Sequence, residues 1–160
     1  MDSAHSPLRL DGTSLCNRLK HDIRFIDLTR ADLTRADLRS ANLTRADLGG
    51  ANLTRADLDL ANLTRASLRS ANLTRAVLAL ADLTGADLTR ANLTGASLGG
   101  ADLTRAILHG ADLTNANLRG ANLTGARWPA NAPIPEGWRL DTGSDRLKRS
   151  GTQSGPPEAK

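Results

Sequence analysis

The chain has 160 residues, a length typical of one domain, and its aromatic residues are limited to one Phe and two Trp. The apolar residues are mostly Leu and Ala, which excludes an ordinary globular core of large interlocking side chains. The formal net charge is +4 from 21 Lys and Arg against 17 Asp and Glu, so the protein is only mildly basic.

Cysteine usage and hydropathy indicate the compartment. Cys16 is the single cysteine, so an internal disulfide is impossible and a reducing compartment fits. The sequence has no apolar run of signal-peptide or transmembrane length. We therefore expect a cytoplasmic protein without a membrane association.

The first 22 residues have no repeat and are expected to form an N-terminal capping segment. Thr13 or Ser14 is a candidate N-cap of a short helix through Leu15. Cys16 and His21 imitate a nucleophile and its base, but no third group accompanies them. A role in covering the first turn of the following domain is the favoured interpretation.

Residues 23–128 repeat every five residues. Leu occupies every fifth position from Leu28 to Leu123 and Ala every fifth from Ala31 to Ala126, 20 of each. This period fits neither a helix, at about 3.6 residues, nor a strand, at 2. Residues two apart point the same way in an extended segment, so each Ala-x-Leu faces inward and a two-residue corner follows. Such units bury their apolar face only by coiling and stacking, as solenoids do.

The unit Ala41-Asn42-Leu43-Thr44-Arg45 resembles the motif of the bacterial pentapeptide-repeat family. The resemblance implies an all-β fold, a right-handed quadrilateral β-helix with four units per coil and about five coils. It also implies a non-enzymatic, rigid protein-interaction module. The alternative from the same family is a protein that protects DNA gyrase or topoisomerase IV from quinolones.

The C-terminal residues after the repeat are expected to cap it. Residues 129–149 are predicted to form a C-terminal cap with a possible β-hairpin around the turn at Thr142–Asp145. Trp128 and Trp138 are expected to plug the last coil. The Gly, Ser and Pro content of residues 150–160 predicts a disordered tail.

Arg recurs at the corners of the units, and residues twenty apart stack when four units make a coil. These possible basic columns are Arg35, Arg55 and Arg75, and Arg45, Arg65 and Arg105. They could bind phosphates or an acidic protein surface. Alternatively they are solvated corners neutralised by Asp32, Asp37, Asp47 and Asp57. The lack of interleaved aromatic residues argues against direct nucleic-acid binding.

Apolar residues also break the repeat at outward positions. The possible partner or dimer patch consists of Leu60, Val77, Ala79, Leu80 and Ile107, with His109 beside the last. An exposed apolar cluster marks a contact with another protein or with a second copy of the chain. We therefore expect either a monomer that binds a partner or a homodimer. The other interpretation is drift on a tolerant surface.

Two further expectations concern corners and chemistry. Gly becomes frequent at the last position of the unit after residue 80, which predicts more type II corners in the C-terminal half. Thr follows the central Leu at every tenth residue from Thr34 to Thr124, and the resulting rows of Thr suggest ice binding as a third, minor function. We find no catalytic constellation, no cofactor-binding motif and no metal-ligand cluster, so neither an enzyme nor a cofactor is expected.

Overall fold

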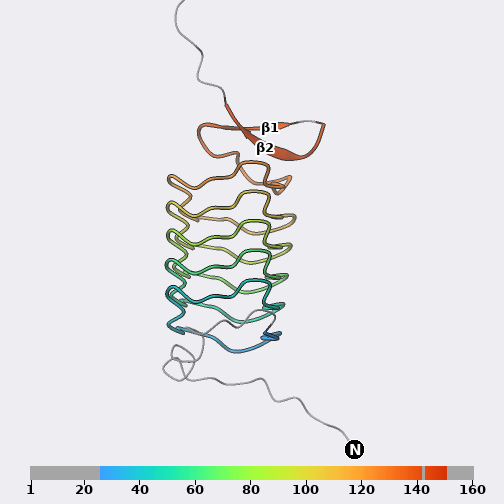
Figure 1. The fold of residues 1–160 in the computed structure, drawn as a ribbon. Helices are drawn as coiled ribbons and strands as arrows, with labels where there is room; N and C mark the ends of the chain where they lie inside the picture. The colour runs from blue at the N-terminus through green and yellow to red at the C-terminus, as the bar shows by residue number, and fades with distance from the viewer. Residues whose placement is uncertain (1–25, 142, 151–160) are drawn as a thin grey trace, which may run out of the picture.

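The computed structural model describes residues 26–141 and 143–150. The expected N-terminal segment 1–22 and most of the expected tail lie outside these residues. Within the repeat, each unit pairs in parallel with the unit twenty residues later, from Asp27↔Asp47 to Ile107↔Arg127. Four five-residue units therefore make one coil without a bulge, as predicted. The coils stack into a rod (Figure 1).

The inside of the rod is a ladder of Leu and Ala. Every central Leu from Leu33 to Leu108 is at most 1% exposed, and the Ala residues from Ala31 to Ala106 are at most 2% exposed. Removing each Leu from water contributes roughly 1.5–3 kcal/mol. Ala, two residues before each Leu, is small enough to let the walls approach. No polar or charged side chain of the described residues is buried.

Backbone hydrogen bonds between coils run along the rod axis. The Leu33 N–H, for example, donates to the Asn52 carbonyl at 2.8 Å, and the Asn52 N–H donates to the Ala31 carbonyl at 2.9 Å. The same pattern recurs from coil to coil, so a change of register in one unit would break the bonds of both neighbouring coils.

The predicted difference between N-terminal and C-terminal corners is wrong. The last residue of every unit from Arg30 to Gly125 has a φ between 54° and 72°, whether it is Gly, Arg, Ser, Leu or Asn. The preceding residue is not in this region, which is the pattern of a type II turn. Hydrogen bonds inside the turn and to the next coil hold non-Gly residues there despite the steric cost of a left-handed conformation. Glycine relieves that strain but is not required for the turn.

The second position of the unit stabilises the corner that follows. Every Asp or Asn at this position from Asp27 to Asn122 accepts a hydrogen bond at Oδ1 from the backbone N–H two residues later. The Asp or Asn of the motif is therefore an Asx turn built into the repeat. Some Thr hydroxyls add a second bond, such as Thr34 Oγ1 to Asp32 at 2.6 Å.

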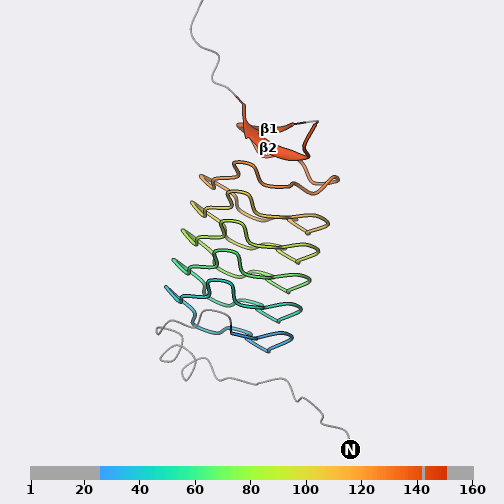
Figure 2. The same ribbon diagram turned by 45° about the vertical axis from the view of Figure 1, so that its right-hand side comes forward.

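A β-hairpin lies across the C-terminal end of the rod (Figure 2). Strand β1 (Trp138–Asp141) pairs antiparallel with β2 (Arg146–Arg149). Strand β2 also joins the last coil, because the Gly125 N–H donates to the Leu147 carbonyl at 2.8 Å and the Leu147 N–H to the Ala126 carbonyl at 2.9 Å. Leu147 and Trp128 are buried, and Trp138 packs partly buried against the core. In the described part of the chain, no helix is long and apolar enough to cross a membrane.

Candidate functional site

One side of the rod carries most of the apolar departures from the repeat. We call it the variable face and define it as residues 36–40, 56–60, 76–80, 96–100 and 116–120, which stack through Asp37↔Asp57↔Val77↔Ser97↔Asn117. It brings together Leu60, Val77, Ala79 and Leu80. Ile107 lies on the opposite side, because it pairs with Asp87 and Arg127, half a coil away. The five residues predicted as one patch therefore form a group of four and a separate position.

The side chains of the group are exposed in spite of local costs. Leu60, Val77 and Leu80 are 54%, 37% and 60% exposed. Val77 cannot accept a hydrogen bond from the corner N–H as Asp57 and Asn72 do, so the Ala79 N–H has no side-chain acceptor among the described residues. Leu60 and Leu80 have φ values of 58° and 56°, where a side chain is disfavoured. These residues therefore do not serve the stability of the corner.

Leu80 leans over the corner of the next coil. A Cβ on Gly100 would lie 2.7 Å from Leu80 Cδ2, whereas one on Gly95 would lie 3.5 Å from Arg75 Cγ. The two glycines have φ values of 68° and 66°, so the backbone strain of a substitution is the same at both. The absence of a side chain at Gly100 thus allows the Leu80 side chain to lie flat against the rod.

This contact gives a stability prediction. We expect Gly95→Ala to lower the free energy of unfolding by about 1–2 kcal/mol through left-handed strain alone. Gly100→Ala should cost about 0.5–1.5 kcal/mol more, because Leu80 must leave its rotamer. Urea denaturation measures both. In a Leu80→Gly background the excess at Gly100 should disappear; equal costs for the two glycines in the original chain would contradict the contact.

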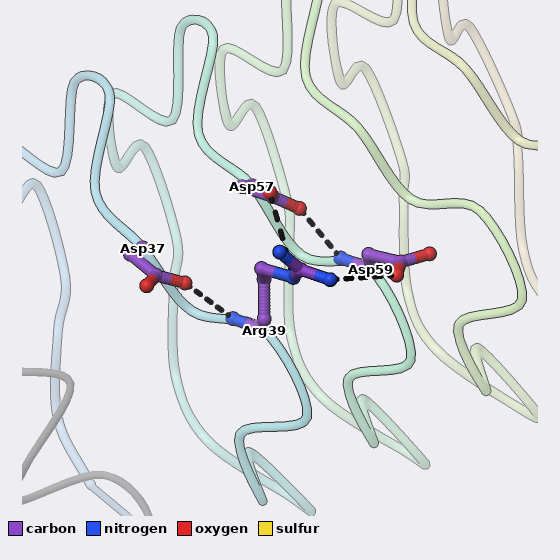
Figure 3. Close-up of polar contacts among 4 residues, drawn as sticks. All are labelled: Asp37, Arg39, Asp57 and Asp59. Carbon is purple, nitrogen blue, oxygen red and sulfur yellow. Dashed lines mark hydrogen bonds and ion pairs between the residues drawn. The ribbon is translucent and has the colours of Figure 1, made fainter.

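An ion-paired cluster lies at the N-terminal end of the group. Arg39 Nε lies 3.8 Å from Asp57 Oδ2, and Arg39 Nη2 lies 3.8 Å from Asp59 Oδ2, both in the next coil (Figure 3). The Asp57 carboxylate also accepts the Asp59 backbone N–H. The two acidic residues beside the apolar group are thus already engaged by a cation of the chain.

The corner at the other edge of the variable face carries the first basic column. Arg35, Arg55 and Arg75 stack in consecutive coils and, with the neighbouring Thr residues, line a shallow groove of about 360 Å³. No ion pair within residues 26–141 and 143–150 involves their guanidinium groups. Asp47 and Asp57, two of the Asp residues expected to neutralise the columns, accept corner N–H groups instead.

The second basic column is interrupted. Arg45 and Arg65 stack, Gly85 occupies the next position and Arg105 follows. One bordering face, residues 61–65, 81–85 and 101–105, shares the corner of Leu60 and Leu80 but carries Asn62, Asp82 and Asp102 where the variable face carries Val77; the other has no group of exposed apolar residues. Arg65 nevertheless has an exposed side chain and a left-handed backbone conformation like Arg55, with φ values of 57° and 58°. The two columns therefore offer the same chemistry in different surroundings.

A larger cavity, missed in the sequence, lies at the C-terminal end. It has a volume of about 1250 Å³ between the last coil and the segment leading to β1, with Leu113, Leu118 and Trp128 in its wall. The Trp128 Nε1 atom is buried without a hydrogen-bond partner. Strand β2 covers only one corner of the last coil, and this partial coverage leaves the hollow. Its signal in the sequence is the run Pro129, Pro133 and Pro135, because proline has no backbone N–H to continue the ladder over the last coil.

Two partly buried carboxylates of the rod, Asp82 and Asp87, have lowered pKa values. Burial would raise the pKa of Asp87, but hydrogen bonds from Thr89 and Arg69 outweigh it and hold that pKa below its ordinary value. The pKa of Asp82 is lowered in the same way by Thr84, against the effect of burial. A general acid at neutral pH needs the opposite shift. Within the described residues, no group of three or more His, Cys, Asp or Glu could hold a metal ion.

Comparison with known proteins agrees with the geometry. The family model described as "Pentapeptide repeats" matches residues 22–59, 61–100 and 86–125. No curated protein matches the chain. Among solved structures, a pentapeptide-repeat protein of the cyanobacterium Cyanothece is 29% identical, with 70% of this chain and 95% of that chain covered and a TM-score of 0.49.

Two proteins of the cyanobacterium Nostoc are also similar. The pentapeptide-repeat protein alr5209 is 32% identical, with 76% of this chain and 87% of that chain covered and a TM-score of 0.43. HetL, a pentapeptide-repeat protein involved in heterocyst differentiation regulation, is 37% identical, with 69% and 65% covered and a TM-score of 0.34. The chain thus spans slightly less than two thirds of HetL. On the family match, which covers more than half of the chain, and the stacked four-unit coils, the chain belongs to the pentapeptide-repeat family.

Proposed function

We propose that this protein is a non-enzymatic interaction module that binds another protein through the variable face. The observation that carries the proposal is the exposure of Leu60, Val77 and Leu80 in a repeat that otherwise places Leu inside and polar residues outside. Water contact with three neighbouring apolar side chains is unfavourable, and the corner gains nothing in return. A partner that covers them would recover part of that free energy.

The repeat itself supplies variants that test this function without harming the fold. Val77→Asn restores the Asx turn, and Leu80→Arg introduces the residue that Arg75 provides at a corner of the same conformation. We expect the double variant to be at least as stable as the original chain, by up to about 1 kcal/mol from the new hydrogen bond. It should lose the partner that the original chain captures from its native cell extract, measured by affinity capture and mass spectrometry.

Ile107→Asn is the matched control. It makes the same change as Val77→Asn on the opposite side of the rod and should leave capture unchanged. Sedimentation velocity on the same proteins separates a partner from a second copy, because self-association through the patch would depend on concentration and vanish in the double variant. Unchanged capture and unchanged sedimentation in a folded double variant would reject the variable face as the binding surface.

The topoisomerase-protection alternative gains no support from the charge of the rod. From Ile23 to Trp128 there are 13 Arg and 10 Asp, a difference of +3. A surface that imitates the phosphates of DNA should be negative. We therefore retain the protein-binding function as the proposal, in a reducing, cytoplasmic setting that the lone Cys16 favours.

A further inference from the structure

We infer that the variable face binds an acidic amphipathic α-helix, laid parallel to the rod axis. This inference rests on the proposed function and specifies the chemistry of the partner. The apolar group alone is small, since stable interfaces use about 20–30 residues on each side. Neighbouring polar groups of the same face must therefore contribute to binding.

The variable face has two chemically different edges. Within one unit the chain passes from Arg55, at one corner, through Ala56, Asp57 and Leu58 to the next corner at Leu60. The stacking of coils extends the first edge into the column Arg35, Arg55 and Arg75, and the second into the pair Leu60 and Leu80. Val77 lies between the edges. A complementary partner presents acidic groups along one line and apolar groups along a parallel line.

The charges of this face favour an acidic partner over a basic one. The guanidinium groups of Arg35, Arg55 and Arg75 have no ion-pair partner in the described chain, as shown above. Asp57 and Asp59, the acids nearest the apolar pair, are engaged by Arg39. Carboxylates of a partner would thus meet free cations and displace no existing ion pair, which favours both association rate and correct register.

The spacing of the column selects a helix over a strand. Stacked coils repeat at about 4.8 Å, so three consecutive Arg residues span roughly 10 Å. Helical residues at i, i+4 and i+7 share one side and also span roughly 10 Å at 1.5 Å per residue. Same-side residues of an extended strand lie about 6.7 Å apart, and three of them span roughly 13 Å. Three carboxylates on a helix therefore match the three guanidinium groups.

The width of the face agrees with this orientation. The extended stretch between the two corners holds three residues, which places the edges roughly 10 Å apart. An α-helix with its side chains is about 10–12 Å wide. One helix can therefore contact the Arg column with one flank and Leu60 and Leu80 with the other. Gly99 and Gly100, farther along the same face, add no side chain of their own to its path.

The test uses a synthetic probe and the full-length protein. The probe is a fluorescein-labelled helical peptide of about three turns. It has Glu at i, i+4 and i+7, and Leu directly after each Glu, at i+1, i+5 and i+8. One control peptide has the same composition with the Leu residues moved to the side opposite the Glu residues. A second carries a central Pro that prevents the helix. Fluorescence anisotropy measures binding to the protein.

Two charge reversals distinguish the columns. Arg55→Glu changes the edge of the variable face next to Val77, and Arg65→Glu makes the same change at an exposed corner of the other column with the same backbone conformation. We expect Arg55→Glu to weaken the probe about tenfold and Arg65→Glu to weaken it less than twofold. A probe whose central Glu is replaced by Lys should recover binding to Arg55→Glu. Circular dichroism confirms that both variants are folded.

The possible results separate this inference from the proposed function. Saturable binding of the probe, weaker binding of both control peptides and the Arg55 preference support the inference. No saturable binding, equal binding of the control peptides or equal effects of the two reversals would overturn it. If capture of the native partner still depends on Val77 and Leu80 in that case, the proposed function stands and only the helical, acidic partner is wrong.

Discussion

Leu73→Ala is expected to lower the free energy of unfolding by about 2–5 kcal/mol, a large part of the stability of a protein of this size. Leu73 is fully buried in the middle of the ladder, with stacked Leu residues above and below it in the coils that contain Leu53 and Leu93. The backbone bonds on both sides hold the walls apart at a fixed distance, so the cavity left by the substitution cannot collapse. Equilibrium urea denaturation measures the loss.

Leu60→Ala is the matched control within the same repeat. It removes the same atoms from a side chain that is 54% exposed, so it should change stability by at most about 0.5 kcal/mol. Since a solenoid couples each coil only to its neighbours, the Leu73→Ala variant should also unfold less cooperatively, with a broader urea transition. Similar losses for the two substitutions would show that the ladder is not the main source of stability.

Leu147→Asp is expected to detach the hairpin from the rod without unfolding the coils in the middle. Leu147 is completely buried where β2 meets the last coil, and a carboxylate there would lose its hydration without gaining a partner. Loss of the leucine side chain alone costs about 2–5 kcal/mol. Hydrogen exchange should therefore show faster exchange at Gly125 and Leu147, with Leu53 unchanged.

Arg139→Asp provides the comparison for the cap. Arg139 lies on β1, is exposed and pairs with Lys148 only through the strand register, so the hairpin should remain docked.

Detachment of the hairpin in the Leu147→Asp variant also uncovers the strand edge of the last coil, which invites pairing between molecules. We expect concentration-dependent association of the Leu147 variant in sedimentation velocity. A monomeric variant with unchanged exchange at Gly125 would show that β2 does not protect the end.

The periodicity of the sequence was sufficient to predict the coil. Leu and Ala at a strict five-residue spacing leave no continuous apolar face in a helix or a strand, and stacking was the remaining way to bury them. The twenty-residue pairing follows from the four units per coil that the family resemblance implied, and the structure confirms it. The hairpin around residues 138–149 was also predictable, because a turn signal separates two short segments of alternating polarity.

The corner conformation was not predictable from the glycines. Arg75 and Gly95 occupy the same left-handed turn because bonds to the neighbouring coils hold the backbone, and those bonds are absent from any local pattern. The Asx turns were missed for a related reason. The Asp and Asn of the motif were treated as outward polar residues, but their Oδ1 atoms accept corner N–H groups that would otherwise have only water.

The candidate site depends on some features that follow from the sequence alone and on others that need the tertiary structure. By itself the sequence determined the inside of the rod and the positions that break the repeat, because both depend on spacing, and the family resemblance added the four units per coil that stack residues into columns. Only the tertiary structure decided how far Leu60, Val77 and Leu80 are exposed, and that Arg39 engages Asp57 and Asp59 while Arg55 has no ion pair within the described residues. Ion pairing and the exposed fraction of a side chain depend on the reach and direction of side chains across coils, which the period of the repeat does not specify.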